Sequence, residues 1–265
     1  MKGRILSENW LFTLGEGDIK KRERIDTLLV KRGLVPSRSR AHSLIMAGSV
    51  FVDGSRVDKS GTLVKADSRI EVRGGDLRYV SRGGIKLEAA LMGFNVDVRD
   101  KTALDIGAST GGFTDCLLQH GAKVVYAVDV GYGQLDWRLR NNPRVIVMER
   151  TNARYLKPED IGERVDITTI DVSFISLTKV IPAILGILKP GGTLIALIKP
   201  QFEVGKGEVG RGGIVRDEDK QRDVIRRITV FLEDTGFRIL GVIPSPILGA
   251  DGNREFLVGG VLNAG

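Results

Sequence analysis

The chain has 265 residues, of which 40 are Lys or Arg and 33 are Asp or Glu, giving a formal net charge of +7. Its 42% hydrophobic and 28% charged residues exclude a collagenous, low-complexity or wholly disordered chain. The excess charge lies early, since residues 1–80 hold 16 basic and 10 acidic residues and residues 81–265 hold 24 and 23. This distribution favours two domains, the first binding a polyanion, although a basic surface without a partner would give the same counts.

No segment of the sequence is typical of a membrane or secreted protein. The longest apolar run, residues 180–188, is far shorter than the ~20 residues of a membrane span, and the N-terminus lacks the apolar core of a secretory signal. The single cysteine, Cys116, excludes an intramolecular disulfide and a cysteine-based zinc cluster. We therefore predict a cytoplasmic protein without a metal site, and we interpret Cys116 as a small buried hydrophobe.

The first domain is predicted from short amphipathic segments. Apolar residues at helical spacing predict a helix within residues 24–33, and Ser37 is a good N-cap for a second helix that ends at Gly48. The Asp53-Gly54 pair predicts a hairpin turn, and alternation over residues 68–72 predicts a further strand. The predicted division of the chain is an N-terminal extension, 1–21, a small α+β domain, 22–75, a linker, 76–82, and a larger domain, 83–265.

This first domain resembles the S4 family of RNA-binding modules. The matching pattern is R-I-D-x-L-L-V-x-R-G-L, followed by S-R-S-R-A-x-x-L-I-x-A-G-x-V-x-V-D-G. The resemblance implies that the second helix and the hairpin face structured RNA, which proteins recognise mainly by shape and backbone contacts. The side chains that it implies for phosphate contact are Lys31, Arg32, Arg38 and Arg40, with His42 beside them. Taken alone, His42 is more typical of a neutral surface side chain.

In the larger domain, strand-like apolar runs alternate with helical segments. The predicted strands are residues 103–106, 124–128, 145–148, 167–172, 193–198, 237–242 and 256–261. The predicted helices are residues 112–120, 135–140, 177–188 and 218–235. The alternation predicts an α/β fold with a doubly wound, Rossmann-like sheet of seven strands, in which ligands bind at the carboxyl ends of the strands. The last two strands are expected to pair antiparallel at one edge.

A glycine-rich turn follows the first predicted strand of this sheet. Its pattern, D-x-G-x-x-x-G-G from Asp105 to Gly112, differs from the G-x-G-x-x-G of dinucleotide-binding enzymes. It resembles the turn of S-adenosylmethionine-dependent methyltransferases, in which an acidic residue at the end of the next strand holds the ribose. Asp129 stands there, 24 residues after Asp105. The cofactor-binding residues that this resemblance implies are Asp105, Gly107, Ala108, Ser109, Thr110, Gly111, Gly112, Phe113, Asp129, Asn152 and Asp171.

Four charged residues are expected to meet at the carboxyl edge of the sheet. Lys199 and Asp171 each follow an apolar strand. Glu255 begins the last strand, and Lys86 precedes the first. Each of them alone could be an ordinary solvated strand cap. Together they resemble the Lys-Asp-Lys-Glu quartet of ribose 2′-O-methyltransferases.

The whole chain resembles the TlyA family, in which an S4-like module precedes a methyltransferase and which is often labelled hemolysin. The matching stretches are S-R-G-G-x-K-L, D-I-G-A-S-T-G-G-F-T-D, D-V-S-F-I-S-L, K-P-Q-F-E and N-x-E-F-L. The resemblance implies methyl transfer from S-adenosylmethionine to a cytidine ribose, with ribosomal RNA or a ribosomal subunit as partner. Two features agree. D-V-S-F stands where base-amine methyltransferases carry N/D-P-P-Y/F, and Cys116 is not placed to attack a cytosine carbon.

A ribose hydroxyl needs deprotonation and in-line alignment to attack a sulfonium methyl group. Our hypothesis gives Lys199 the role of base, because in a water-poor site beside a second cation its ammonium would titrate lower than in solution. Asp171 would orient Lys199. Lys86 and Glu255 would place the ribose and balance the charge.

The segment 203–216, E-V-G-K-G-E-V-G-R-G-G-I-V-R, follows the strand that carries Lys199. We predict that it is a mobile lid in which Lys206, Arg211 and Arg216 clamp RNA phosphates. A plain flexible surface loop would have the same composition.

Three other functions stay open at the level of sequence. They are methylation of another RNA or of a small molecule, a non-catalytic RNA-binding factor in ribosome assembly, and a membrane-active cytolysin. The basic module argues against a small molecule, and the intact quartet argues against a non-catalytic factor. The lack of a spanning or strongly amphipathic cationic segment argues against membrane lysis. We expect a monomer without a membrane partner.

Overall fold

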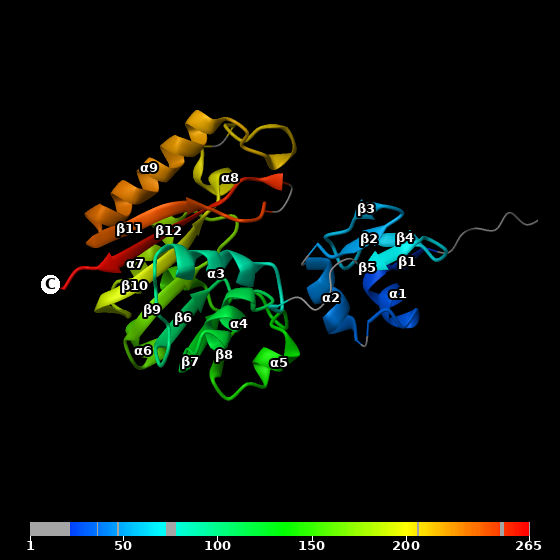
Figure 1. Cartoon of the computed structure of the whole chain (residues 1–265), viewed down its shortest axis with the longest axis horizontal. Coiled ribbons are helices and arrows are strands. Elements are labelled where there is room, and N and C mark those ends of the chain that lie inside the picture. The colour runs from blue at the N-terminus through cyan, green and yellow to red at the C-terminus, as the bar shows by residue number, and fades with distance from the viewer. Residues whose placement is uncertain are drawn as a thin grey trace, which may run out of the picture.

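The structure is a computed structural model that describes residues 22–35, 37–46, 48–72, 78–205, 207–249 and 252–264. The predicted N-terminal extension and the start of the predicted linker lie outside these ranges. Figure 1 shows a small N-terminal module beside a larger α/β domain.

In the described residues of the N-terminal module, two helices combine with two small antiparallel sheets. Its elements are β1 (Arg22–Arg24), α1 (Ile25–Lys31), α2 (Arg38–Met46), β2 (Val50–Val52), β3 (Ser55–Arg56), β4 (Leu63–Lys65) and β5 (Ile70–Val72). The strands are ordered β3-β2-β5 in one sheet and β1-β4 in the other. Ile25, Leu29 and Ile45 are fully buried in the core between the helices and the sheets. The predicted hairpin is present at Asp53 (φ 49°) and Gly54 (φ 81°), whereas β1, whose residues are all charged, was not predicted.

The larger domain contains a seven-stranded mixed sheet in the order β11-β12-β10-β9-β6-β7-β8. Its strands are β6 (Thr102–Ile106), β7 (Val124–Val128), β8 (Val145–Met148), β9 (Val165–Ile170), β10 (Leu188–Ile198), β11 (Phe237–Pro244) and β12 (Phe256–Leu262). Strands β6 to β10 are parallel, and β12 runs antiparallel between β10 and β11. The predicted Rossmann-like α/β fold is therefore confirmed, and the expected antiparallel pair is β11–β12.

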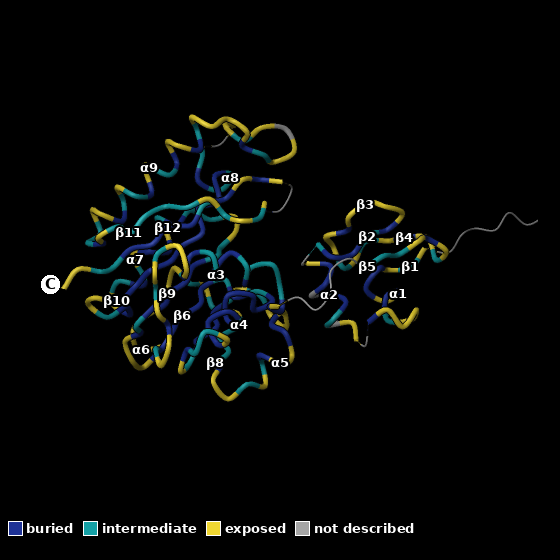
Figure 2. Tube along the Cα trace, viewed as in Figure 1, coloured by how far each residue is buried: buried dark blue, intermediate teal, exposed yellow. Residues whose placement is uncertain are grey.

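Helices cover both faces of this sheet. They are α3 (Gly83–Gly93), α4 (Gly112–Gln119), α5 (Trp137–Arg140), α6 (Pro158–Ile161), α7 (Ile181–Ile184), α8 (Pro200–Glu203) and α9 (Glu218–Asp234), with 3₁₀ helices η1 (Ala153–Tyr155), η2 (Leu177–Lys179) and η3 (Arg211–Gly213). Successive strand residues point to opposite faces. Ala103 and Ile195 therefore pack with α3 and α4, and Leu104 and Leu194 pack with α7 and α9. Figure 2 shows the buried residues concentrated along the central strands.

Two segments differ from the helices that the sequence predicts. The predicted helix over residues 177–188 is replaced by η2 and α7, and β10 already begins at Leu188. Pro182 fits only the first turn of a helix because it lacks an N–H, so the segment divides there. Helix α3, which carries Lys86, was not predicted because it begins with two glycines. A Cβ at Gly84 would lie 2.2 Å from Cγ of Tyr79, so the glycine lets the helix rest on this buried ring.

None of the helices in the described part of the chain is long and apolar enough to cross a membrane.

Candidate active site

The glycine-rich turn joins β6 to α4 at the carboxyl edge of the sheet. Gly107 (φ 83°), Ser109 (φ 48°) and Gly111 (φ 96°) all have left-handed backbone conformations, which turn the chain sharply from strand to helix. A Cβ at Gly107 would lie 2.3 Å from the carbonyl oxygen of Asp171. The turn therefore packs directly against the end of β9 and forms a backbone cradle there.

Asp129 follows β7, and its half-buried carboxylate lies across this turn. The backbone N–H of Ser109 donates to Oδ2 at 2.8 Å, and that of Gly131 donates to Oδ1 at 2.6 Å. Backbone contacts thus fix the carboxylate, which retains acceptor capacity for further donors. Ribose hydroxyls are donors of this kind. The cradle and Asp129 together fit the nucleoside part of S-adenosylmethionine.

The other residues of the turn are mostly inside the protein. Those that are buried are Ala108, Thr110, Gly111, Gly112 and Phe113. Phe113 belongs to the core cluster shared with α3 and α4. Asn152 is exposed and accepts a hydrogen bond from the backbone N–H of Arg154 at 3.1 Å, which caps η1. The cofactor contacts predicted for these residues stay predictions.

Asp105 lies beneath the turn and is completely buried. The hydroxyls of Thr114 and Thr169 donate to its two carboxyl oxygens at 2.6 and 3.0 Å. Burial raises the pKa of Asp105 to about 7, although these two hydrogen bonds oppose the shift. The residue joins β6 to α4 and β9 and thereby supports the turn from inside.

The structure brings the four charged residues together as two ion pairs. Lys199 Nζ lies 2.6 Å from Asp171 Oδ1, and Lys86 Nζ lies 2.5 Å from Glu255 Oε2. Lys86, Lys199 and Glu255 are each at most 9% exposed. Asp171, Lys199 and Glu255 stand at the ends of β9, β10 and β12, whereas Lys86 comes from α3.

The two ion pairs influence each other through Asp171. Burial alone would raise the pKa of Asp171, but the positive charges of Lys199 and Lys86 lower it. Asp171 is therefore an anion at neutral pH. It lies within electrostatic reach of both lysines, so the quartet forms one continuous charge network from Glu255 to Lys199.

Two side chains without a predicted role contact Lys199. Ser173 Oγ accepts a hydrogen bond from Nζ at 3.0 Å, and Nζ lies 5.9 Å from the centre of the Phe202 ring. Phe202 packs against Phe174 with 4.9 Å between the ring centres, and Phe174 is 90% exposed. Ser173 and Phe174 belong to the D-V-S-F stretch, and Phe202 belongs to K-P-Q-F-E. Both stretches match the family pattern, and this match was the sequence feature that could have indicated these residues.

Two protein families match this chain. The FtsJ-like methyltransferase family matches residues 79–261, and the S4 domain matches residues 23–70. The chain belongs to the FtsJ-like methyltransferase family.

Relatives match this FtsJ-like methyltransferase over most of its length. A Bacillus subtilis protein named as an rRNA methyltransferase is 53% identical over 90% of this chain and 85% of its own length. A Mycobacterium tuberculosis protein named 16S/23S rRNA (cytidine-2′-O)-methyltransferase TlyA is 47% identical over 90% of this chain and 89% of its own. A solved structure described as a hemolysin from Streptococcus thermophilus is 47% identical with a TM-score of 0.73, covering 92% of this chain and 90% of that one. The predicted resemblance to the TlyA family is confirmed.

Cys116 lies in the core of the FtsJ-like domain. It is fully buried, and burial raises the pKa of its thiol to about 12. The thiol therefore stays protonated at neutral pH. This agrees with the interpretation of Cys116 as a small buried hydrophobe.

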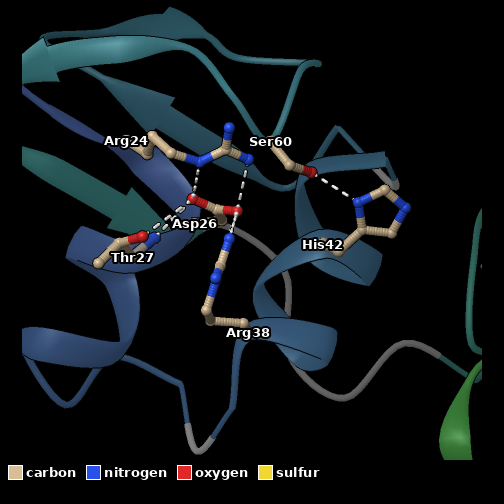
Figure 3. A network of polar contacts seen from close by, with 6 residues as sticks. All are labelled: Arg24, Asp26, Thr27, Arg38, His42 and Ser60. Atoms are coloured by element: carbon tan, nitrogen blue, oxygen red, sulfur yellow. Dashed lines mark hydrogen bonds and ion pairs between the residues drawn. The ribbon is translucent and has the colours of Figure 1, made fainter. Parts of the chain in front are cut away.

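In the S4 domain a buried aspartate organises the basic surface (Figure 3). Asp26 accepts hydrogen bonds from Arg24 at 2.9 Å and from Arg38 at 2.9 Å. Burial alone would raise the pKa of Asp26, but the two arginines hold it well below its usual range. The guanidinium groups are thereby oriented while the arginine side chains remain at least half exposed. Arg24 and Asp26 had no predicted role, although both lie at the start of the matching pattern.

The other predicted phosphate contacts have different surroundings. Lys31 forms an exposed ion pair with Glu23 at 2.9 Å, and Arg32 donates to the carbonyl of Ser68 at 2.7 Å. Arg40 is half-buried. His42 Nδ1 lies 2.7 Å from Ser60 Oγ, and burial lowers the pKa of its ring, which favours the neutral form.

The predicted lid is anchored at its C-terminal end. Val215 is buried, its N–H donates to Asn253 Oδ1 at 3.2 Å, and its carbonyl accepts from Gln221 Nε2 at 2.7 Å. Arg216 is exposed, whereas Lys206 and the side chain of Arg211 lie outside the described part of the chain. Mobility of the remaining segment stays a prediction.

Proposed function

We propose that this chain transfers the methyl group of S-adenosylmethionine to the 2′-hydroxyl of a cytidine ribose in ribosomal RNA. The observation that carries the proposal is the buried pair Lys199–Asp171 beside the pair Lys86–Glu255, at the strand ends where ligands of such sheets bind. The choice of acceptor is supported by the relative named for cytidine 2′-O-methylation. The S4 domain supports an RNA over a small molecule.

The donor is assigned to the cradle formed by the glycine-rich turn. Bound there, S-adenosylmethionine supplies an electrophilic methyl group on a positively charged sulfur. Asp129 would accept hydrogen bonds from the ribose hydroxyls of the nucleoside, and the backbone at Gly107 and Ser109 lines the cradle. Asp105 keeps the turn in place from beneath through Thr114 and Thr169.

Lys199 is assigned as the base. Lys199 Nζ would take the proton of the ribose 2′-hydroxyl, so that the 2′-oxygen could attack the methyl group that the donor supplies and the donor's thioether could leave. Lys199 must present a neutral amine to accept this proton. Asp171 and Ser173 hold Nζ in place, and Asp171 neutralises the ammonium once the proton has arrived.

Glu255 and Lys86 are assigned to the acceptor. The Glu255 carboxylate can accept a hydrogen bond from a ribose hydroxyl, and Lys86 compensates its charge at 2.5 Å. Both are nearly buried, so a ribose held there is shielded from water.

The RNA is assigned to the S4 domain and to the lid. Lys31, Arg32, Arg38 and Arg40 contact phosphates from the S4 domain. The basic residues of the lid, Lys206, Arg211 and Arg216, clamp the strand that carries the target. Limited proteolysis of residues 203–216 is expected to slow when RNA is bound, and equal cleavage with and without RNA argues against a clamp.

One experiment tests the proposed reaction. The purified chain is incubated with labelled S-adenosylmethionine and separated ribosomal subunits, and 2′-O-methyl positions are mapped by primer extension at low nucleotide concentration. We expect label at a cytidine ribose of one or both subunits, and none with Lys199→Met. Label on a base contradicts the assigned chemistry, while RNA binding without any label favours a non-catalytic assembly factor. Lysis of liposomes favours a cytolysin.

The predicted cytoplasmic location follows from a ribosomal substrate and stays a prediction, as does the monomeric state.

A further inference from the structure

Glu203 is a buried carboxylate that the mechanism above does not use. It ends α8 and the K-P-Q-F-E stretch, and it is 8% exposed. Lys199, the assigned base, immediately precedes this helix. Any group that fixes α8 therefore also fixes the residue from which the catalytic amine extends.

The carboxylate of Glu203 binds the chain that follows Asp171. The backbone N–H of Leu177 donates to Oε1 at 2.8 Å, and the hydroxyl of Ser176 donates to Oε2 at 2.7 Å. On the other side, the backbone carbonyl of Glu203 accepts a hydrogen bond from Arg227 of α9. Glu203 thus joins the segment after β9 to the segment after β10 and rests both on α9.

The sheet alone does not hold these two segments together. The register of β9 and β10 ends with Ile170 opposite Ala196, before either catalytic residue is reached. The N–H of Asp171 bonds instead to the carbonyl of Ile106 in β6. Phe174 then takes a φ of 64°, a conformation that is unfavourable for residues other than glycine. The chain after this irregular turn needs a contact that fixes its position, and Glu203 provides it through Ser176 and Leu177.

We propose that Glu203 is a positioning residue that sets the distance between Asp171 and Lys199. Its carboxylate spans from the end of α8, four residues after Lys199, to Ser176, five residues after Asp171. The inference rests on the proposed function, because the positioned groups are those assigned to proton transfer. Glu203 itself touches neither the donor nor the ribose.

Kinetics of the intact chain test this role. Glu203→Gln preserves the size of the side chain but leaves one acceptor oxygen in place of two, so either the Leu177 N–H or the Ser176 hydroxyl loses its acceptor. We expect kcat for methyl transfer to ribosomal subunits to fall about tenfold, because small misplacements of a reacting group are costly. The KM for the subunit and the Kd for S-adenosylmethionine should stay within twofold of wild type. Glu233→Gln, an exposed substitution on α9, is the matched control and should keep the wild-type kcat.

A second variant separates positioning from folding. Ser176→Ala removes one of the two donors without altering the carboxylate, and it should lower kcat in the same direction. The double variant Glu203→Gln/Ser176→Ala should be no slower than the slower single variant, because both changes break the same contact. A kcat within twofold of wild type for Glu203→Gln overturns the proposal. The proposal is also overturned if the lower kcat is accompanied by weaker binding of S-adenosylmethionine and by a lower melting temperature.

A structural measurement decides the inference independently of turnover. Crystal structures of the wild type and of Glu203→Gln should show the distance between Lys199 Nζ and Asp171 Oδ1, 2.6 Å here, increase beyond hydrogen-bond reach in the variant. An unchanged distance overturns the positioning role. If the wild type methylates no subunit, the proposed function fails, and this comparison still tells whether Glu203 holds the pair.

Discussion

Asp26 in the S4 domain and Asp105 in the FtsJ-like domain are both buried, but their partners differ. Asp26 faces the guanidinium groups of Arg24 and Arg38, which hold its pKa well below the usual range. Asp105 faces two threonine hydroxyls, and burial raises its pKa to about 7. A drop in pH therefore weakens the S4 network while it relieves the buried charge of the FtsJ-like domain.

The cations of the two domains differ in the same way. In the S4 domain Lys31 and Arg38 are exposed and pair with residues close in sequence. In the FtsJ-like domain Lys86 and Lys199 are buried and pair with partners far along the chain. The exposed pair of Lys31 is weak and screened by salt, so this cation can exchange its carboxylate for a phosphate at little cost. Buried pairs are insulated from salt and hold a fixed geometry.

The largest effect is expected at the buried pair. Lys199→Met removes the assigned base and should lower the rate of methyl transfer by about a thousandfold, within the range typical of general-base removal. Affinity for RNA, measured by filter binding, should stay unchanged because the S4 domain is untouched. Lys199→Arg should be similarly inactive, since arginine does not give up its proton. Near-normal transfer by either variant contradicts the assignment.

The second prediction concerns stability against pH. An unfolded Asp105 ionises near pH 4 and the folded one near pH 7, so the stability that it contributes is full below pH 4 and is lost as the pH rises through 7. The loss amounts to about 4 kcal/mol. Asp105→Asn cannot ionise and should become more stable relative to wild type by this order between pH 4 and pH 8. Urea unfolding at closely spaced pH values measures it, and parallel curves for the two proteins would refute the shift.

The third prediction concerns the S4 network. Asp26→Ala leaves Arg24 and Arg38 without their shared acceptor and should destabilise the S4 domain by about 2 kcal/mol. Hydrogen exchange of the α1 and α2 amides should accelerate accordingly, while amides of β6 and β9 serve as the internal control. The stability from Asp26 depends on pH in the opposite direction to that from Asp105. The stability from Asp26 is present above pH 4 and is lost as the pH falls through its lowered pKa.

The smallest effect is expected from a single exposed cation. Arg38→Gln should weaken RNA binding a few-fold and reduce the slope of log affinity against log salt by about one. Arg99→Gln is the matched control, because Arg99 is an exposed arginine paired with Asp97 in the FtsJ-like domain. Equal slopes for the two variants would show that Arg38 does not contact the RNA.

The fold of the FtsJ-like domain could be predicted because its strands are apolar runs of regular spacing. The boundaries that were missed depend on tertiary contacts. Helix α3 requires Gly84 to lie against Tyr79, whereas two adjacent glycines are, by local sequence alone, typical of a loop. Strand β1 consists of three charged residues that form a strand only because β4 pairs with them.

Prediction of the candidate site from the sequence is limited in the same way. Residues at the ends of parallel strands meet at one edge, so the convergence of Asp171 and Lys199 follows from the order of strands. The meeting of Lys86 and Glu255 was expected only from the family resemblance, because Glu255 lies 169 positions away and reaches Lys86 only after β12 has inserted beside β10. The contact of Ser173 with Lys199 depends on the irregular turn after β9, for which local sequence has no periodic signal.

The packing of Gly107 against the carbonyl of Asp171 has a consequence for mutational screens. A side chain at this position would push the end of β9 away and shift the carboxylate that pairs with Lys199. An inactive Gly107→Ala enzyme would then look like one that has lost its methyl donor, although the damage lies in the alignment of the proton acceptor. Donor affinity and turnover must be scored separately before any substitution in this turn is taken as evidence about the donor.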